Sequence, residues 1–269
     1  ISDYSHTWCS CNFKRIRNFM IQQRQFIDLN CDLGEGVGNE RELMPLISSC
    51  NLACGGHAGD SETINSVIAL ATKYNVEVGA HPSFPDRENF GRTVIKISFD
   101  ELKNSLLKQI DLVKESCHRF NIKLHHIKFH GALYNLSASN EDYAQFITRL
   151  IEEYYPEIPI YVPFNSAIGN LANGRVKLIY EGFADRNYEK DGSLVSRSKN
   201  DAVLTDLNRI FEHVFGMVNR NEIKTISDTI LNVNIDTICV HGDTPKAVKI
   251  LKDLNHNLLN SGIEIKAVK

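Results

Sequence analysis

The chain has 269 residues, of which 42% are hydrophobic and 23% are charged, and its formal net charge is −3. This composition is ordinary for a globular protein, and the absence of a basic stripe argues against a nucleic-acid partner. No apolar stretch approaches the roughly 20 residues that cross a bilayer, so we expect no membrane partner.

The cysteines and the N-terminal segment both favour a cytoplasmic location. The seven cysteines are scattered and odd in number, as expected for reduced thiols. Residues 1–19 lack the uninterrupted apolar segment and the small-residue cleavage site of a signal peptide. We predict that residues 1–25 form a disordered or non-native extension with Met20 as the natural start. Residues 26–269 are predicted to form one catalytic domain.

The first regular element is the stretch from Phe26 to Gly38, FIDLNCDLGEGVG, around which the rest of the chain is organised. It begins as an apolar run typical of a buried strand and then changes to Asn30, Asp32 and Glu35 among glycines. An α/β enzyme places its chemistry where a buried parallel strand runs into such residues. We therefore expect the site at this end of the first strand.

The same layout recurs along the chain. Each later stretch runs from apolar residues into His, Asp, Glu or Lys beside Gly or Pro: CNLACGGHAGD, VEVGAHPSFPD, HIKFHGALYN, KLIYEGFADRNY and TICVHGDTP. IPIYVPFN is a further predicted strand, and IEIKAV a short final one. Convergence of so many polar strand ends predicts one shared site.

Helical patterns separate these strands. Asp60 offers an N-cap, and Ser98 with Glu101 forms a capping-box pattern. The predicted helices run through residues 39–49, 64–75, 101–120, 140–154 and 204–218, a segment near Ser227, and a last helix with Pro245 in its first turn.

Alternation of strands and helices predicts parallel βαβ units and an α/β fold that is a single β/α barrel, with seven strands as the favoured number. Neither a GxGxxG turn nor a GxxxxGK[ST] loop is found. Two polar loops, over residues 84–93 and 187–200, are predicted to close over a substrate.

The chain resembles the LamB/YcsF family. The matching stretches are IDLNCDLGEG, NLACGGHAGD, VGAHPSFPD, FGR, KFHGALYN, EGFADRNY, GSLVSR and CVHGDTP, in order from Phe26 to the C-terminus. The family usually has an aromatic residue at Gly56, a Pro at Phe129 and a second Arg at Thr93, and at these departures we expect altered packing only.

The resemblance implies a seven-stranded β/α barrel similar to those of glycoside hydrolases and polysaccharide deacetylases. It also implies that the chain acts as the A subunit of the ATP-dependent 5-oxoprolinase. Together with subunits B and C, that enzyme converts 5-oxo-L-proline, ATP and water to L-glutamate, ADP and phosphate. Because the chain lacks a phosphate-cradling loop, we expect the partner subunits to handle ATP mainly and this barrel to hydrolyse the activated lactam.

Opening a lactam needs a base for water, donors for the developing oxyanion and an acid for the leaving nitrogen. We predict Asp32 as the base, with Glu35 as the alternate, although acids after a strand also cap helices. His57, between glycines that let the backbone approach a ligand, and His241, positioned to donate a proton, complete the predicted catalytic set.

A second set is predicted to bind the substrate. Arg92 and Arg186 match a carboxylate or phosphoryl group, and Glu181, Asp185 and Tyr188 are expected to orient Arg186. Lys128 and His130 alternate along one strand and so share a face; for Lys128 an ion pair with an Asp inside the barrel is the alternative. The full set is Asn30, His81, Arg92, Lys128, His130, Glu181, Arg186 and Asp243.

A divalent metal is the main rival chemistry. Asp32 and His57, together with His81 or His130, form a ligand set of the kind that binds zinc, nickel or cobalt in deacetylase-like barrels. Two alternative functions follow. One is a metal-dependent deacetylase or glycosidase-like hydrolase, and the other is a non-catalytic binding subunit.

Overall fold

Seven parallel strands close into a barrel in the computed structural model, which describes residues 25–269. The barrel confirms the predicted fold, and apart from Gln25 the predicted extension and the start at Met20 lie outside the described residues. The strands pair in the order β1 (Phe26–Leu33), β2 (Ser49–Ala53), β3 (Glu77–His81), β4 (His126–Lys128), β5 (Ile160–Pro163), β6 (Leu178–Phe183) and β9 (Thr237–Cys239).

The barrel closes where β9 pairs with β1, through the register Asp28 with Thr237 and Asn30 with Cys239. β1 also pairs with β2 and, at its start, with the short strand β10 (Glu264–Ile265). Successive side chains of a strand point to opposite faces. Asp28, Asn30 and Asp32 therefore share one face, and their hydrogen bonds to β4, β5 and β6 show that it is the interior.

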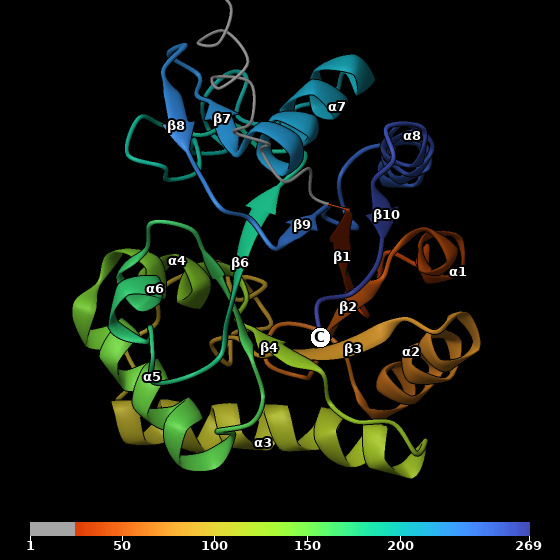
Figure 1. The fold of residues 1–269 in the computed structure, drawn as a ribbon. Coiled ribbons are helices and arrows are strands. Elements are labelled where there is room, and N and C mark those ends of the chain that lie inside the picture. The colour runs from red at the N-terminus through yellow and green to blue at the C-terminus, as the bar shows by residue number, and fades with distance from the viewer. Residues whose placement is uncertain (1–24) are drawn as a thin grey trace, which may run out of the picture.

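Helices surround this barrel, as Figure 1 shows for α2, α3 and α8. The capping box of Ser98 and Glu101 is present, and Asp60 accepts a hydrogen bond from the Thr63 amide. The helices are α1 (Glu40–Leu43), α2 (Ser61–Tyr74), α3 (Phe99–Arg119), α4 (Gly131–Ser139), α5 (Glu141–Tyr154), α6 (Ala167–Leu171), α7 (Leu207–Phe215) and α8 (Ala247–Asn260). A 3₁₀ turn, η1 (Met44–Leu46), follows α1, and a π-helical turn, η2 (Gly216–Arg220), follows α7. None of the helices in this described part is both long and apolar enough to cross a bilayer.

Two sequence predictions about local structure were wrong. The segment near Ser227 is the turn of an antiparallel hairpin, β7 (Glu222–Lys224) and β8 (Ile230–Asn232), and no helix forms there. This hairpin lies beside α7 (Figure 1). Within KFHGALYN the strand ends at Lys128, and α4 begins only three residues later, at Gly131. The apolar run fitted a strand as well as a helix because short runs carry too few periods to separate the two.

Other boundaries moved by a few residues. The predicted helix over 39–49 is only α1 and η1, because β2 already begins at Ser49. Pro245 lies before the Lys246 cap of α8 and so outside its first turn.

Candidate active site

Titratable side chains from six of the seven barrel strands meet at the carboxyl end of the barrel. This is the face where β/α barrels carry their chemistry. The residues lie at the ends of strands or just beyond them: Asp32 and Glu35 after β1, His57 after β2, His81 on β3, Lys128 and His130 on or after β4, Glu181 on β6, and His241 after β9. The predicted convergence of strand ends is confirmed.

Lys128 is buried beneath this mouth between two carboxylates. Its Nζ lies 3.0 Å from Asp32 Oδ1 and 2.8 Å from Glu181 Oε1. Burial lowers the pKa of Lys128, but Asp32, followed by Cys239 and Glu181, outweighs it and raises this pKa well above its usual value. Burial likewise raises the pKa of Asp32, and Lys128 outweighs it and holds that pKa well below its usual value. The ion pair that we gave as the alternative role of Lys128 is thus present.

Asn30 binds protein groups on several strands. Its Nδ2 donates to Glu181 Oε1 at 3.0 Å and to Thr237 Oγ1 at 2.8 Å. Its Oδ1 accepts from Asn51 Nδ2 at 2.7 Å, and Asn51 also donates to Asp32 Oδ1 at 2.7 Å. Because Asn30 is fully buried and binds these groups, we infer that it positions the acids around Lys128.

Above the ion pair, three histidines surround Glu35. Glu35 Oε1 lies 3.0 Å from His57 Nε2, 3.5 Å from His130 Nδ1 and 3.9 Å from His81 Nε2. The rings of His57 and His130 stack with their centroids 3.7 Å apart. One ligand atom of each of the four residues lies within 4.8 Å of the others, as a metal site requires. Here Glu35 joins the histidines, whereas the predicted ligand set had Asp32, which instead pairs with Lys128.

Burial sets the protonation of this cluster. Burial, with the charge of Asp32 added, raises the pKa of Glu35 to about 7. Burial, with the nearby His81 added, lowers the pKa of His57 to about 2 and also depresses the pKa of His130. His57 and His130 are therefore neutral at neutral pH, the form in which a histidine offers a lone pair.

The loop predicted over the site covers the histidines. The Phe90 ring packs edge-on against His57 at 5.1 Å and His130 at 5.3 Å. The backbone of Gly131 has φ +58°, and a Cβ there would lie 2.5 Å from the carbonyl oxygen of Gly91. Glycine at 131 therefore permits the close approach that holds the loop on the site.

The entrance carries two arginines around one acid. Arg92 Nη2 lies 2.8 Å from Asp243 Oδ2, and Arg197 Nη1 lies 4.0 Å from the same oxygen. The side chains of Arg92 and Asp243 are 47% and 30% exposed, so an anion from solvent can compete for these guanidinium groups.

His241 forms a separate pair with Asp185 at the mouth. Its Nδ1 donates to Asp185 Oδ1 at 3.0 Å, and Thr244 donates its hydroxyl to the same carboxylate. Burial lowers the pKa of His241, but Asp185 outweighs it, so this pKa lies above its ordinary value of 6.5. The ring is 16% exposed and can meet a substrate.

Arg186 forms hydrogen bonds to the backbone of its own loop. Its Nη2 donates to the Val195 carbonyl at 2.6 Å, and its Nε lies 3.4 Å from the Ala202 carbonyl. Our expectation that Glu181, Asp185 and Tyr188 orient Arg186 was wrong. Glu181 binds Lys128, Asp185 binds His241, and the Tyr188 hydroxyl accepts from the Phe183 amide.

Sequence reasoning missed a polar layer below the site. Asp28 accepts hydrogen bonds from Ser48 at 2.6 Å, Ser49 at 2.8 Å and Tyr161 at 2.9 Å. The alternation of Asp28, Asn30 and Asp32 was a readable signal of a polar interior face. The serines and Tyr161 carry no such signal because their contacts depend on how the barrel closes.

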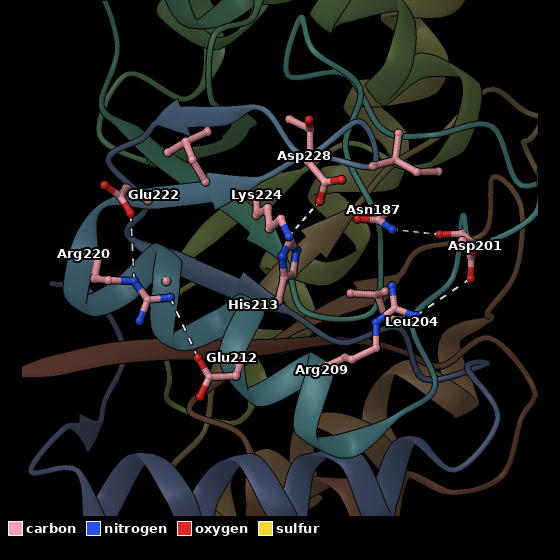
Figure 2. Close-up of a pocket in the computed structure, with 14 residues that line it drawn as sticks. Asn187, Asp201, Leu204, Arg209, Glu212, His213, Arg220, Glu222, Lys224 and Asp228 are labelled. Carbon is pink, nitrogen blue, oxygen red and sulfur yellow. Dashed lines mark hydrogen bonds and ion pairs between the residues drawn. The ribbon is translucent and has the colours of Figure 1, made fainter.

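A pocket of about 460 Å³ lies elsewhere, between α7, η2 and the β7–β8 hairpin (Figure 2). Its charged side chains pair with one another: Lys224 with Asp228 at 2.7 Å, and Arg220 with Glu222 at 3.9 Å. Because these groups are mutually neutralised and largely exposed, we place the chemistry at the barrel mouth, where buried groups converge.

Comparison with known proteins yields consistent matches. The model of the family described as "LamB/YcsF family" matches residues 27–269. A Staphylococcus aureus (strain Newman) protein, named as the A subunit of 5-oxoprolinase, is 39% identical over 248 residues, which cover 90% of this chain and 99% of that protein. A solved structure from Thermus thermophilus, of a lactam utilization protein, is 31% identical, with a TM-score of 0.85. That match covers 90% of this chain and 100% of the Thermus chain.

Proposed function

Because the chain belongs to the LamB/YcsF family, we propose that it is the lactam-hydrolysing subunit of a 5-oxoprolinase, which opens 5-oxo-L-proline to L-glutamate. The observation that carries this proposal is the cluster of buried acids and bases at the barrel mouth. It occurs in a chain that is 39% identical to the A subunit of a 5-oxoprolinase over nearly that protein's whole length.

The five-membered lactam is a poor electrophile, and its opening in water is nearly balanced or uphill. Phosphorylation of the lactam oxygen by ATP makes the ring carbon attackable. Because the chain has no phosphate-cradling glycine loop, we assign ATP handling to partner subunits B and C. This barrel then receives the activated lactam.

In this proposal the substrate carboxylate binds at the entrance. It displaces Asp243 from Arg92 and Arg197, whose guanidinium groups match a carboxylate in geometry and charge. The ring of the lactam then lies toward the acids and histidines below.

Asp32 accepts the proton of the attacking water. The hydrogen bonds from Asn51 and Lys128 both go to its Oδ1, while its Oδ2 is turned toward His81, 3.6 Å away. Its low pKa keeps it ionised, as a base must be. The alternate base, Glu35, contacts the three histidines instead.

His241 donates the proton to the leaving nitrogen. Its raised pKa favours the protonated form, and Asp185 fixes the ring through Nδ1 so that Nε2 carries the transferable proton. Water adds to the phosphorylated ring carbon, and the carbon–nitrogen bond breaks to give γ-glutamyl phosphate, in which the former ring nitrogen is the amino group. A second water then hydrolyses this acyl phosphate to glutamate and phosphate.

The test is glutamate release from 5-oxoproline and ATP, measured with this chain alone and with candidate B and C subunits. We expect activity only in the mixture, and loss of at least about 100-fold in Asp32→Asn. Asp142→Asn, an exposed acid of α5, is the matched control and should keep full activity.

A silent mixture, or full activity of Asp32→Asn in the assembled complex, would contradict the proposal. The second outcome would favour the non-catalytic binding subunit. Hydrolysis of an N-acetyl sugar by the chain alone would favour the metal-dependent deacetylase or glycosidase reading.

A further inference from the structure

Two buried histidine nitrogens lie within hydrogen-bonding distance of each other. His130 Nδ1 lies 3.0 Å from His81 Nε2, and both side chains are at most 8% exposed. A contact of this length between nitrogens is favourable only when one nitrogen carries a hydrogen or a cation lies between them.

The remaining ring nitrogens fix where the hydrogens are. His81 Nδ1 lies 2.7 Å from the Lys128 carbonyl oxygen, and His130 Nε2 lies 3.0 Å from the Phe90 carbonyl oxygen. A carbonyl oxygen only accepts, so these nitrogens carry the hydrogens. In the neutral rings the two facing nitrogens are therefore both lone-pair acceptors.

The third histidine follows the same logic. The Ser83 hydroxyl donates to the Phe84 carbonyl at 2.8 Å, which leaves its oxygen to accept from His57 Nδ1 at 3.1 Å. His57 Nε2 then also presents a lone pair, and it points at Glu35 Oε1, 3.0 Å away. A carboxylate oxygen is again an acceptor.

Four electron-pair donors thus lie within 4.8 Å of one another. When the rings are neutral and Glu35 is ionised, no hydrogen lies among them. We propose that His57 Nε2, His81 Nε2, His130 Nδ1 and Glu35 Oε1 bind one divalent transition-metal ion of the zinc type. Donation of the outer ring hydrogens to carbonyl and hydroxyl oxygens is the support that metal-binding histidines have in other proteins.

The spacing suits such an ion. With metal–ligand bonds of about 2.0–2.1 Å, neighbouring ligand atoms of a tetrahedron lie roughly 3.3 Å apart. The measured separations of 3.0, 3.0, 3.5 and 3.9 Å bracket this value. Three nitrogens and one carboxylate oxygen favour zinc, cobalt or nickel over magnesium and calcium, which prefer oxygen ligands.

The ion would lie at the proposed reaction site, where such an ion polarises a carbonyl oxygen. Its binding does not depend on the proposed function, because the ligand set is complete within this chain. An experiment can therefore disprove the metal site without disproving the proposed lactam hydrolysis, and the reverse.

The test is titration of chelator-treated full-length protein with Zn²⁺ by calorimetry, with Mg²⁺ as the comparison ion. We expect one Zn²⁺ per chain and no comparable Mg²⁺ binding. His130→Ala and Glu35→Gln should each weaken Zn²⁺ binding by at least about 100-fold, since loss of an outer-shell partner alone costs 10- to 100-fold. Ser83→Ala, which removes the acceptor for His57 Nδ1, should weaken it by about 10-fold.

His256→Ala is the matched control, because it removes an exposed histidine on α8 and should leave zinc binding unchanged. Circular dichroism of each variant separates loss of the site from loss of the fold, and Ser83→Ala leaves all four ligands in place. No zinc binding to the folded wild-type chain would overturn the proposal, as would equal binding by wild type and folded His130→Ala and Glu35→Gln.

Discussion

Lys128 Nζ and Asp32 Oδ1 lie 3.0 Å apart inside the barrel, and the two side chains are only 3% and 6% exposed. Glu181, on the other side of Lys128, is fully buried. One ammonium group is therefore the cation shared by two carboxylates that have almost no access to water. Removal of that ammonium leaves both carboxylates uncompensated, and the cost of an unpaired buried charge is large.

Lys128→Met should destabilise the protein by about 3–5 kcal/mol, the usual cost of breaking a buried pair. Urea unfolding at neutral pH measures the free energy. Lys252→Met, on the exposed side of α8, is the control and should change the free energy by less than about 0.5 kcal/mol. Equal stability of the two variants would show that Asp32 and Glu181 become hydrated or protonated when Lys128 is absent.

Asp185→Asn should destabilise the protein by about 3 kcal/mol near neutral pH, because it leaves the partly buried His241 without its anionic partner. The pKa of His241 is raised, so the contribution of the pair is full below the ordinary pKa and falls as pH rises through the raised value. The pKa of Asp185 is lowered, so the contribution also falls in acid.

Unfolding of wild type and Asp185→Asn across pH 4 to 10 therefore should show the largest free-energy difference in the weakly acidic to neutral range. A difference that grows steadily toward alkaline pH would contradict the assigned charge states.

Gly131→Ala should cost more than Gly174→Ala, although both glycines have positive φ, +58° and +77°. At Gly174 a Cβ meets nothing within 4 Å, so we expect only the left-handed backbone cost, about 1–2 kcal/mol. At Gly131 the Cβ clash with the Gly91 carbonyl adds to it, for a total of about 3 kcal/mol or more. Thermal unfolding compares the two variants. Equal losses of stability would show that the loop containing Gly91 moves away from the added Cβ at little cost.

Arg92→Gln should raise the KM for 5-oxoproline by about 10-fold or more with a smaller change in kcat, because the lost charge binds a carboxylate far from the ring bond. The assembled complex is the sample, and 2-pyrrolidinone, which lacks the carboxylate, is the comparison substrate. Hydrolysis of 2-pyrrolidinone, if detectable in wild type, should be little affected by Arg92→Gln. An unchanged KM for 5-oxoproline would remove Arg92 from the substrate site.

Much of the candidate site could be predicted because its signals are local. The run FIDLNCDLGEG shows an apolar strand that ends in acids, and the histidines at 57 and 81 follow or end later strands of the same kind. Parallel strands bring such ends to one edge, so the convergence follows from the order of elements alone. The helix wrongly predicted near Ser227 shows the limit, since a short mixed segment carries no clear period.

The sequence by itself thus determined the barrel and the set of residues at its mouth, because the hydrophobic periodicity of a strand or a helix is visible within a short stretch of sequence. Only the tertiary structure decided which groups meet. Lys128 pairs with Asp32 and Glu181, Arg186 is used by its own loop, and Glu35 joins the histidines. The partners of Lys128 and of Glu35 come from strands far apart in the chain, and their contacts depend on how the strands of the barrel pair and close.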